Sequence, residues 1–227
     1  KWTHISYRRW VVSEMIKKIK TLTNLINEAF VLVLRTNTKD EGIETAKAAI
    51  KGGCNIIEVT FTIPNADKVI EELIKDKNEE VVIGAGTVLD AETARIAILA
   101  GAEFIVSPSF DKETATLCNR YGIPYIPGCF TPREIKEARE CGSDVIKLFP
   151  GSAFKPTIVK DLKAPIKGIA VMASGGVSFE NMDEWFNNSC DIVSIGSAII
   201  KLKDPAKIEA ETRKYIERVK KLRMQRG

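Results

Sequence analysis

Short apolar runs recur along most of this chain at similar intervals. Each run has the length of a strand and is apolar at nearly every position, which is typical of strands covered on both faces. Helical patterns with start and stop signals lie between the runs. The pattern therefore predicts alternating strands and helices, with strands near 30–35, 55–61, 81–85, 103–107, 124–127, 145–149, 169–173 and 191–195.

Capping signals mark several predicted helix boundaries. Asp90, Asp111 and Ser178 are predicted N-caps, and residues 131–134 (Thr-Pro-Arg-Glu) have the form of a capping box with proline at the first helical position. Glycine accepts the left-handed conformation that closes a last helical turn. Four glycines are each separated by two residues from the paired apolar residues that open the next strand: Gly53, Gly101, Gly122 and Gly142.

Eight strand-helix units favour a parallel sheet that closes on itself. We predict an α/β fold, a (β/α)8 TIM barrel, with residues 15–227 as a single domain. A doubly wound open sheet is the runner-up, but it does not usually contain eight such regular units. In addition, no G-x-G-x-x-G sequence follows the first strand.

An amphipathic stretch precedes the first strand. It predicts an additional N-terminal helix that covers the closed end of the barrel. Residues 1–14 have no clear pattern, and we interpret them as an extension that is not native, with Met15 as a start. The apolar residues at helical spacing are Ile16, Ile19, Leu22, Leu25, Ile26 and Ala29.

The composition, 44% apolar and 28% charged among 227 residues, is ordinary for a globular protein. No stretch approaches the roughly 20 apolar residues of a membrane helix. Residues 1–28 carry six Lys or Arg against two acids and residues 201–227 carry ten against four, so the segment between them is net acidic. Exposed basic helix faces explain such ends better than nucleic-acid binding. We predict neither a membrane nor a nucleic-acid partner.

Cysteine and histidine usage narrows the chemistry. The five cysteines are scattered without a C-x-x-C pair, which indicates thiols in a reducing cytoplasm. The single histidine, His4, excludes a buried Ser-His-Asp triad and a histidine-rich metal site. We therefore expect chemistry that uses neither such a triad nor such a metal site.

Lys147 interrupts an otherwise apolar run, residues 145–150. Removing an ammonium from water is costly unless it is paired or gives up its proton. One interpretation is a structural ion pair with a buried carboxylate. The other is catalysis, because a desolvated, neutral lysine can attack a carbonyl and form a Schiff base.

Strand alternation places two more charged side chains with Lys147. Arg35, Glu58 and Lys147 each lie on the face of their strand that we expect to point into the barrel. Glu58 could then move protons while Lys147 forms an iminium, although a buried salt bridge without chemistry remains the alternative. The companions on these faces are Val31, Val33, Ile56, Thr60, Thr62, Val145 and Phe149.

Glycine-rich loops follow three strands. Residues 173–176 (Ala-Ser-Gly-Gly) and 196–198 (Gly-Ser-Ala) come after the last two strands, where many barrels bind a phosphate on backbone N–H groups. Residues 84–87 (Gly-Ala-Gly-Thr) follow the third strand. We interpret these two glycines as letting a ligand approach, and Thr87 as a hydrogen-bond donor.

Together these motifs resemble one known family, the class I 2-keto-3-deoxy-6-phosphogluconate (KDPG) aldolases, which include 4-hydroxy-2-oxoglutarate (KHG) aldolases. The matching segments run in order along almost the whole predicted barrel. They are Ile57-Glu58-Val59-Thr60, Gly84-Ala85-Gly86-Thr87, Phe104-Ile105-Val106-Ser107-Pro108, Ile126-Pro127-Gly128, Lys147-Leu148-Phe149-Pro150 and Gly175-Gly176.

The resemblance implies that Lys147 is the Schiff-base lysine and Glu58 the general acid and base, acting through a water. It also implies a cytoplasmic homotrimer that needs no metal and no cofactor, with a phosphorylated keto acid as its small-molecule substrate. The resemblance further implies that Thr87 and Pro108 bind the pyruvate part of the substrate, and that Ser174, Gly175, Gly176, Gly196 and Ser197 bind its phosphate. We also predict Arg35, Thr62 and Phe149 as substrate-binding residues.

Two positions depart from the family pattern. Ser174 stands where many members have threonine before the glycine pair, and it keeps the hydroxyl. Some relatives carry an arginine four residues after the glutamate, where this chain has Thr62. Arg35 could supply that charge instead, so the anionic group that it holds stays open.

The predicted reaction is retro-aldol cleavage of KDPG to pyruvate and glyceraldehyde 3-phosphate, with 4-hydroxy-2-oxoglutarate as a further substrate. The epimeric 2-keto-3-deoxy-6-phosphogalactonate is an alternative. A phosphosugar barrel of other chemistry, such as an epimerase or a thiamine-phosphate-synthase-like enzyme, would explain the glycine loops but not Lys147. A non-catalytic oligomeric scaffold would be expected to lose Lys147 or Glu58, and both are present.

Overall fold

All eight predicted strand positions carry parallel strands, so the barrel prediction is confirmed. The computed structural model describes residues 16–225; the predicted extension and His4 lie outside the described residues. The strands are β1 Phe30–Leu34, β2 Ile56–Thr60, β3 Val82–Gly86, β4 Ile105–Val106, β5 Tyr125–Ile126, β6 Gly128–Cys129, β7 Val145–Leu148, β8 Ala170–Ser174 and β9 Ile192–Ile195.

The sheet closes on itself through one short segment. The strand order is β5-β4-β3-β2-β1-β9-β8-β7-β6, so its two end strands are consecutive in the chain. Pro127 separates them because it has no N–H for the ladder. Its carbonyl accepts from the Lys147 N–H at 2.8 Å, while the Gly128 N–H donates to the Ser107 carbonyl at 2.9 Å. The predicted strand 124–127 therefore becomes two short strands that join the sheet's ends.

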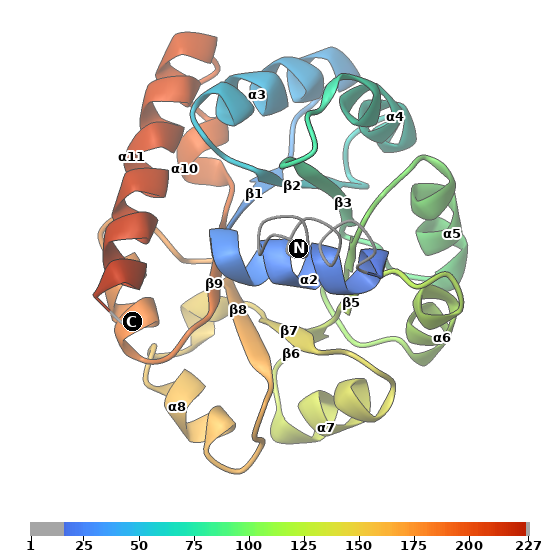
Figure 1. Ribbon diagram of the computed structural model, residues 1–227, viewed down its shortest axis with the longest axis vertical. Coiled ribbons are helices and arrows are strands. Elements are labelled where there is room, and N and C mark those ends of the chain that lie inside the picture. The colour runs from blue at the N-terminus through green and yellow to red at the C-terminus, as the bar shows by residue number, and fades with distance from the viewer. Residues whose placement is uncertain (1–15, 226–227) are drawn as a thin grey trace, which may run out of the picture.

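Helices surround the barrel (Figure 1). Three of them begin at predicted caps: Asp90 accepts from the Thr93 N–H at 2.6 Å, Asp111 from the Thr114 N–H at 2.7 Å, and Thr131 forms a capping box. The helices are α3 Lys39–Lys51, α4 Ala66–Asp76, α5 Ala91–Leu99, α6 Lys112–Arg120, α7 Pro132–Glu140, α8 Ile158–Lys163, α9 Met182–Asn187, α10 Ser197–Ile200 and α11 Pro205–Met224, with a 3-10 turn, η1, at Gly151–Ala153.

The predicted N-cap at Ser178 is wrong. Helix α9 begins later, at Met182, and its N-cap residue is Asn181. The Asn181 side chain accepts from the Ser178 N–H at 2.9 Å, which holds the residues between them in a turn. A serine followed by polar residues fits such a turn as well as a helix start.

The predicted N-terminal helix, α2 Lys17–Glu28, lies across one end of the barrel (Figure 1). Its Leu25 is fully buried in an apolar cluster inside the strands, and Leu22 and Ile26 pack against that cluster. The helix therefore covers the closed end of the barrel, as predicted. The cluster consists of Leu25, Val31, Ile56, Val82, Phe104, Val106, Ile126, Val145, Met172 and Ile192.

Strand alternation sorts the side chains as predicted. Ile57 and Val59 of β2 belong to the large apolar cluster beneath the surrounding helices, whereas Ile56 belongs to the cluster inside the barrel. Burial of the inner and outer faces removes apolar area from water on both sides of every strand. The single-domain assignment for residues 15–227 stays a prediction.

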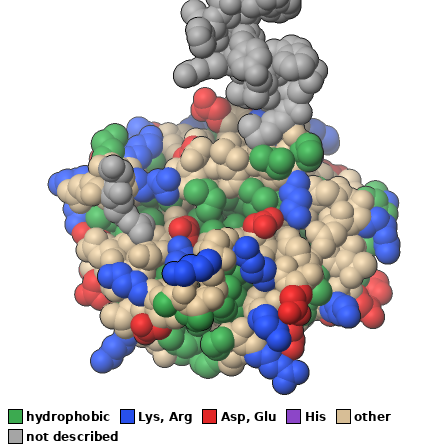
Figure 2. All heavy atoms as spheres, turned by 60° about the horizontal axis from the view of Figure 1, so that its bottom comes forward, with side chains coloured by type: hydrophobic (Ala, Val, Ile, Leu, Met, Phe, Trp, Pro, Cys, Tyr) green, Lys and Arg blue, Asp and Glu red, His purple; other side chains and the backbone are tan. Residues whose placement is uncertain are grey.

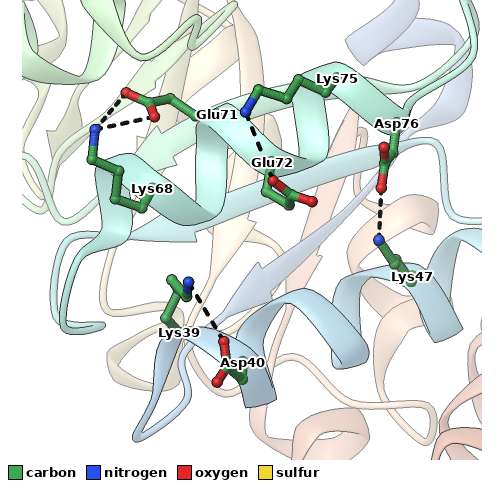
Figure 3. A network of polar contacts seen from close by, with 8 residues as sticks. All are labelled: Lys39, Asp40, Lys47, Lys68, Glu71, Glu72, Lys75 and Asp76. Carbon is green, nitrogen blue, oxygen red and sulfur yellow. Dashed lines mark hydrogen bonds and ion pairs between the residues drawn. The ribbon is translucent and has the colours of Figure 1, made fainter.

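Charged side chains of both signs are interspersed on the molecular face shown in Figure 2. On α3 and α4, Lys47 pairs with Asp76 at 2.7 Å and Lys68 with Glu71 at 2.9 Å (Figure 3). These exposed pairs contribute little to stability, because water and salt screen them. Among the helices of residues 16–225, none combines the length and apolar character of a membrane-spanning segment.

None of the five cysteines forms a disulfide. Burial raises the pKa of Cys54, Cys118, Cys129 and Cys190 to about 12. These four thiols are therefore protonated and inert at neutral pH.

The packing of α2 gives the first prediction. Leu25→Ala should lower the free energy of unfolding by about 2–5 kcal/mol, because it removes a fully buried side chain and leaves a cavity. Ile19→Ala, on the same helix but 49% exposed, should change it by less than about 0.5 kcal/mol. Urea unfolding followed by circular dichroism measures both. Equal effects would contradict the role of α2 as the barrel's apolar cover.

Candidate active site

Lys147 and Glu58 meet inside the barrel, as predicted. Lys147 lies in β7 and is 6% exposed, and Glu58 lies in β2 and is 0% exposed. Lys147 Nζ is 3.7 Å from Glu58 Oε1. That distance is within the reach of charge attraction but too long for a good hydrogen bond.

The Glu58 carboxylate has no other polar partner among the described residues. Neither Oε1 nor Oε2 accepts a hydrogen bond from residues 16–225. A purely structural buried carboxylate would normally be hydrogen-bonded, because leaving it unsatisfied is costly. Within residues 16–225 the Glu58 carboxylate differs from that pattern.

The glycines of β3 make room for protein side chains. A Cβ atom at position 86 would lie 2.1 Å from Glu58 Oε1, and one at position 84 would lie 2.4 Å from the Phe104 ring. The sequence predicts that these glycines let a ligand approach. The structure corrects this: Gly86 accommodates the Glu58 carboxyl, and Gly84 accommodates an aromatic ring of the barrel interior.

Arg35 lies at the mouth of the barrel, just after β1. Its Nη2 donates to the Thr87 hydroxyl at 3.4 Å. Thr87 has a φ of 55°, in the left-handed region, which is uncommon for a β-branched residue. Strained backbone of this kind concentrates at functional sites.

A cavity of about 480 Å³ opens beside Lys147. It brings together most of the predicted phosphate- and substrate-binding residues, and the Phe149 ring centroid lies 5.0 Å from Lys147 Nζ. Three cations and no carboxylate belong to its lining, which suits an anionic ligand. The lining residues are Val33, Arg35, Lys147, Phe149, Ser174, Gly175, Gly176, Val177, Ser194, Ile195, Gly196, Ser197, Ile200 and Lys201.

Three predicted substrate-binding residues do not line this cavity. Thr62 follows β2, where its hydroxyl shares a 2.8 Å hydrogen bond with Thr60. Thr87 reaches the cavity only through Arg35. The Pro108 carbonyl packs so closely on Gly128 that a Cβ atom there would lie 1.9 Å away. Glu58 is also outside the lining, although it contacts Lys147.

The glycines of the predicted phosphate site line the cavity. Gly175 and Gly176 have φ values of 79° and 83°, which side-chain-bearing residues rarely adopt. A Cβ atom at Gly196 would lie 2.6 Å from the Val33 carbonyl. Within residues 16–225, no three His, Cys, Asp or Glu side chains are grouped so that they could hold a metal ion.

The sequence analysis missed two polar lining residues. Ser194 faces inward from β9 and lies two residues from Ile192 and Gly196, so the alternation rule could have found it. Lys201 follows α10 and belongs to no recognised motif. The one sequence feature that points to Lys201 is its place four residues after Ser197, which corresponds to one helical turn.

Residues 22–219 match the family model for KDPG and KHG aldolases. The chain belongs to this aldolase family. It is therefore a lyase of the class I aldolases. The 2-dehydro-3-deoxy-6-phosphogalactonate aldolase of Escherichia coli (strain K12) is 34% identical over 172 residues, 75% of this aldolase and 84% of the relative.

Two further relatives support the assignment of this aldolase. The 2-dehydro-3-deoxy-phosphogluconate aldolase of Treponema pallidum (strain Nichols) is 35% identical over 147 residues, 64% of this chain and 70% of the relative. The KDPG aldolase of Legionella pneumophila was solved with pyruvate captured at low pH as a covalent carbinolamine. Its TM-score is 0.76 at 26% identity, over 84% of this aldolase and 96% of that chain.

The contact of Gly86 with Glu58 gives the second prediction. Gly86→Ala should lower kcat by about 10²-fold, because the new methyl group displaces the carboxyl from Lys147 by the order of an ångström. Gly122→Ala is the matched control. Its Cβ meets no atom within 4 Å, and its φ of 64° costs stability but leaves the site untouched. Steady-state rates of pyruvate release measure both. A Gly86→Ala enzyme with normal kcat would contradict the placement of Glu58.

Proposed function

We propose that this aldolase cleaves KDPG to pyruvate and glyceraldehyde 3-phosphate through a Schiff base on Lys147. The observation that carries the proposal is the buried pair of Lys147 and Glu58 beside a cavity whose lining is cationic. The carbinolamine captured in the Legionella pneumophila relative supports the same chemistry. By the same steps, 4-hydroxy-2-oxoglutarate would give pyruvate and glyoxylate.

The first half of the proposed reaction forms the iminium. The neutral Lys147 amine attacks the C2 ketone of the substrate, and a bond forms between nitrogen and carbon. Glu58 takes the proton that the amine loses and gives it to the alkoxide oxygen, which becomes the carbinolamine hydroxyl. A second proton, which Glu58 takes up from water, is then passed to this hydroxyl, so that it leaves as water and the iminium forms. Burial of Lys147 and Glu58 favours these proton transfers, because water no longer stabilises the two groups as separated charges.

The second half breaks the carbon–carbon bond. Glu58, acting through a water, removes the proton of the C4 hydroxyl, and the C3–C4 electron pair moves into the iminium. Glyceraldehyde 3-phosphate leaves, and the resulting enamine is protonated at C3. Water then hydrolyses the iminium, which releases pyruvate and restores the Lys147 amine.

The rest of the cavity orients the two ends of the substrate. We assign the phosphate to Ser174, Gly175, Gly176, Gly196 and Ser197, because main-chain N–H groups of open glycine loops suit an anion. The other end is assigned to Arg35, Thr62, Thr87, Pro108 and Phe149. Among these, Arg35 has the guanidinium that a carboxylate requires, and Thr87 holds it.

The galactonate epimer is the second candidate substrate. Two observations favour it: the Escherichia coli relative that acts on it matches 75% of this chain, and Thr62 replaces the arginine of some family members. Comparing kcat/KM for the two epimers and 4-hydroxy-2-oxoglutarate decides between them. If kcat/KM is higher for the galactonate, then the galactonate and not KDPG is the substrate, and the mechanism is unchanged.

We also propose that the enzyme is a cytoplasmic homotrimer. The scattered cysteines, none of them in a disulfide, suit a reducing compartment. The trimer rests on the resemblance to the family. Mass photometry at micromolar concentration tests it directly.

The paired roles give the third prediction. Lys147→Met should abolish measurable cleavage, because no nucleophile remains. Glu58→Gln should lower kcat by about 10²–10⁴-fold, because it removes proton transfer but keeps the shape of the side chain. Lys167→Met, an exposed lysine outside the cavity lining, should keep the wild-type rate.

Initial rates of pyruvate release from KDPG, with circular dichroism to confirm folding, measure all three variants. A folded Lys147→Met enzyme that still cleaves the substrate would contradict the Schiff-base mechanism. A folded Glu58→Gln enzyme with normal kcat would contradict only the assigned role of Glu58.

A further inference from the structure

Lys201 is the one cation of the cavity lining that no motif explains. Of the three lining cations, Arg35 donates to Thr87 and Lys147 pairs with Glu58. The Lys201 side chain forms no hydrogen bond or ion pair with the residues from 16 to 225, apart from a longer-range attraction to Glu180. Its ammonium is therefore available to a ligand.

The position of Lys201 in the fold places it beside the glycine loops. Strand β9 lies between β8 and β1, so its C-terminal loop is flanked by Gly175 on one side and Arg35 on the other. The Lys201 N–H donates to the Ser197 carbonyl at 3.3 Å. This single helical turn brings Lys201 onto the same side as Ser197.

Depth separates Lys201 from the reacting groups. Lys147 is buried, whereas Lys201 is exposed at the rim of the same cavity. A substrate whose ketone reaches Lys147 would therefore carry its far end toward the rim. Main-chain N–H groups there can donate to a phosphate but carry no net charge, while an ammonium neutralises part of the dianion.

We propose that Lys201 is a specificity-determining residue that binds the terminal phosphate dianion and makes this aldolase prefer phosphorylated keto acids over their unphosphorylated analogues. The proposal rests on the proposed function. It adds a side-chain cation to a site that the resemblance builds from Ser174, Ser197 and glycines. The unphosphorylated analogue of KDPG has nothing for Lys201 to bind.

Glu180 supplies the counter-charge in the ligand-free enzyme. The Ser178 hydroxyl is the main cause of the lowered pKa of the Glu180 carboxyl, and Lys201 adds a smaller contribution in the same direction. Both side chains are exposed, so salt screens their attraction. A phosphate dianion carries more charge than the carboxylate and can displace it as the partner of Lys201.

The test compares substrates with and without the phosphate. Lys201→Met should lower kcat/KM for KDPG about tenfold, mainly through KM, and leave cleavage of 2-keto-3-deoxygluconate unchanged. Lys201→Arg should restore most of the loss. Lys203→Met, an exposed neighbour outside the cavity lining, should behave as wild type. The KM of the wild type for KDPG should also rise more steeply with salt than that of Lys201→Met.

A second measurement separates this proposal from the Schiff-base mechanism. Exchange of the pyruvate methyl protons with deuterium requires the enamine on Lys147 but no phosphate, and proton NMR follows it. Lys201→Met should exchange at the wild-type rate. Absence of exchange in the wild type would contradict the proposed function. Wild-type exchange with unchanged KDPG cleavage by Lys201→Met, or an equal loss on both substrates, would contradict the role of Lys201 alone.

Discussion

An amine and a carboxyl group held out of water inside a closed ring of strands are the constraint on which the site depends. Lys147 Nζ and Glu58 Oε1 lie 3.7 Å apart, and both side chains are almost completely buried. Such a pair rarely adds stability over apolar residues of similar size, because desolvation offsets the attraction. Gly86 provides the space that the carboxyl needs.

The barrel interior changes character along its axis. On β1, β2 and β7, the inward residues begin with Val31, Ile56 and Val145, which pack beneath α2. Each of these strands then brings a charged residue, Arg35, Glu58 or Lys147, to the C-terminal half. One end of the barrel is therefore a sealed apolar core, and the other opens into the cavity that Lys147 and Arg35 line. The inward-facing side chains of each strand therefore stabilise the barrel at one end and form the functional site at the other.

Much of this arrangement follows from the period of two along each strand. Once Lys147 and Glu58 are assigned to inward faces, closure of the barrel brings them together without further information. The split of the fifth strand at Pro127 could not be foreseen from an apolar run, because it depends on both neighbours of the strand. Ser178 was mistaken for an N-cap because a turn held by Asn181 uses the same kind of residue.

Tertiary contacts decide the remaining features. The roles of Gly84 and Gly86 depend on Phe104 and Glu58, which local sequence does not connect to them. Lys201 lines the cavity because the single turn of α10, which follows β9, closes with the Lys201 N–H donating to the Ser197 carbonyl. Long flexible side chains at a rim carry no periodic signal, so their partners emerge only from the assembled fold.

Reductive trapping tests the central claim most directly. The enzyme is treated with borohydride in the presence of pyruvate, digested and mapped by mass spectrometry. A nucleophilic amine inside the barrel predicts a reduced pyruvyl adduct on the peptide that contains Lys147, and no adduct in Lys147→Ala. Labelling at another lysine, or at none, would contradict the account.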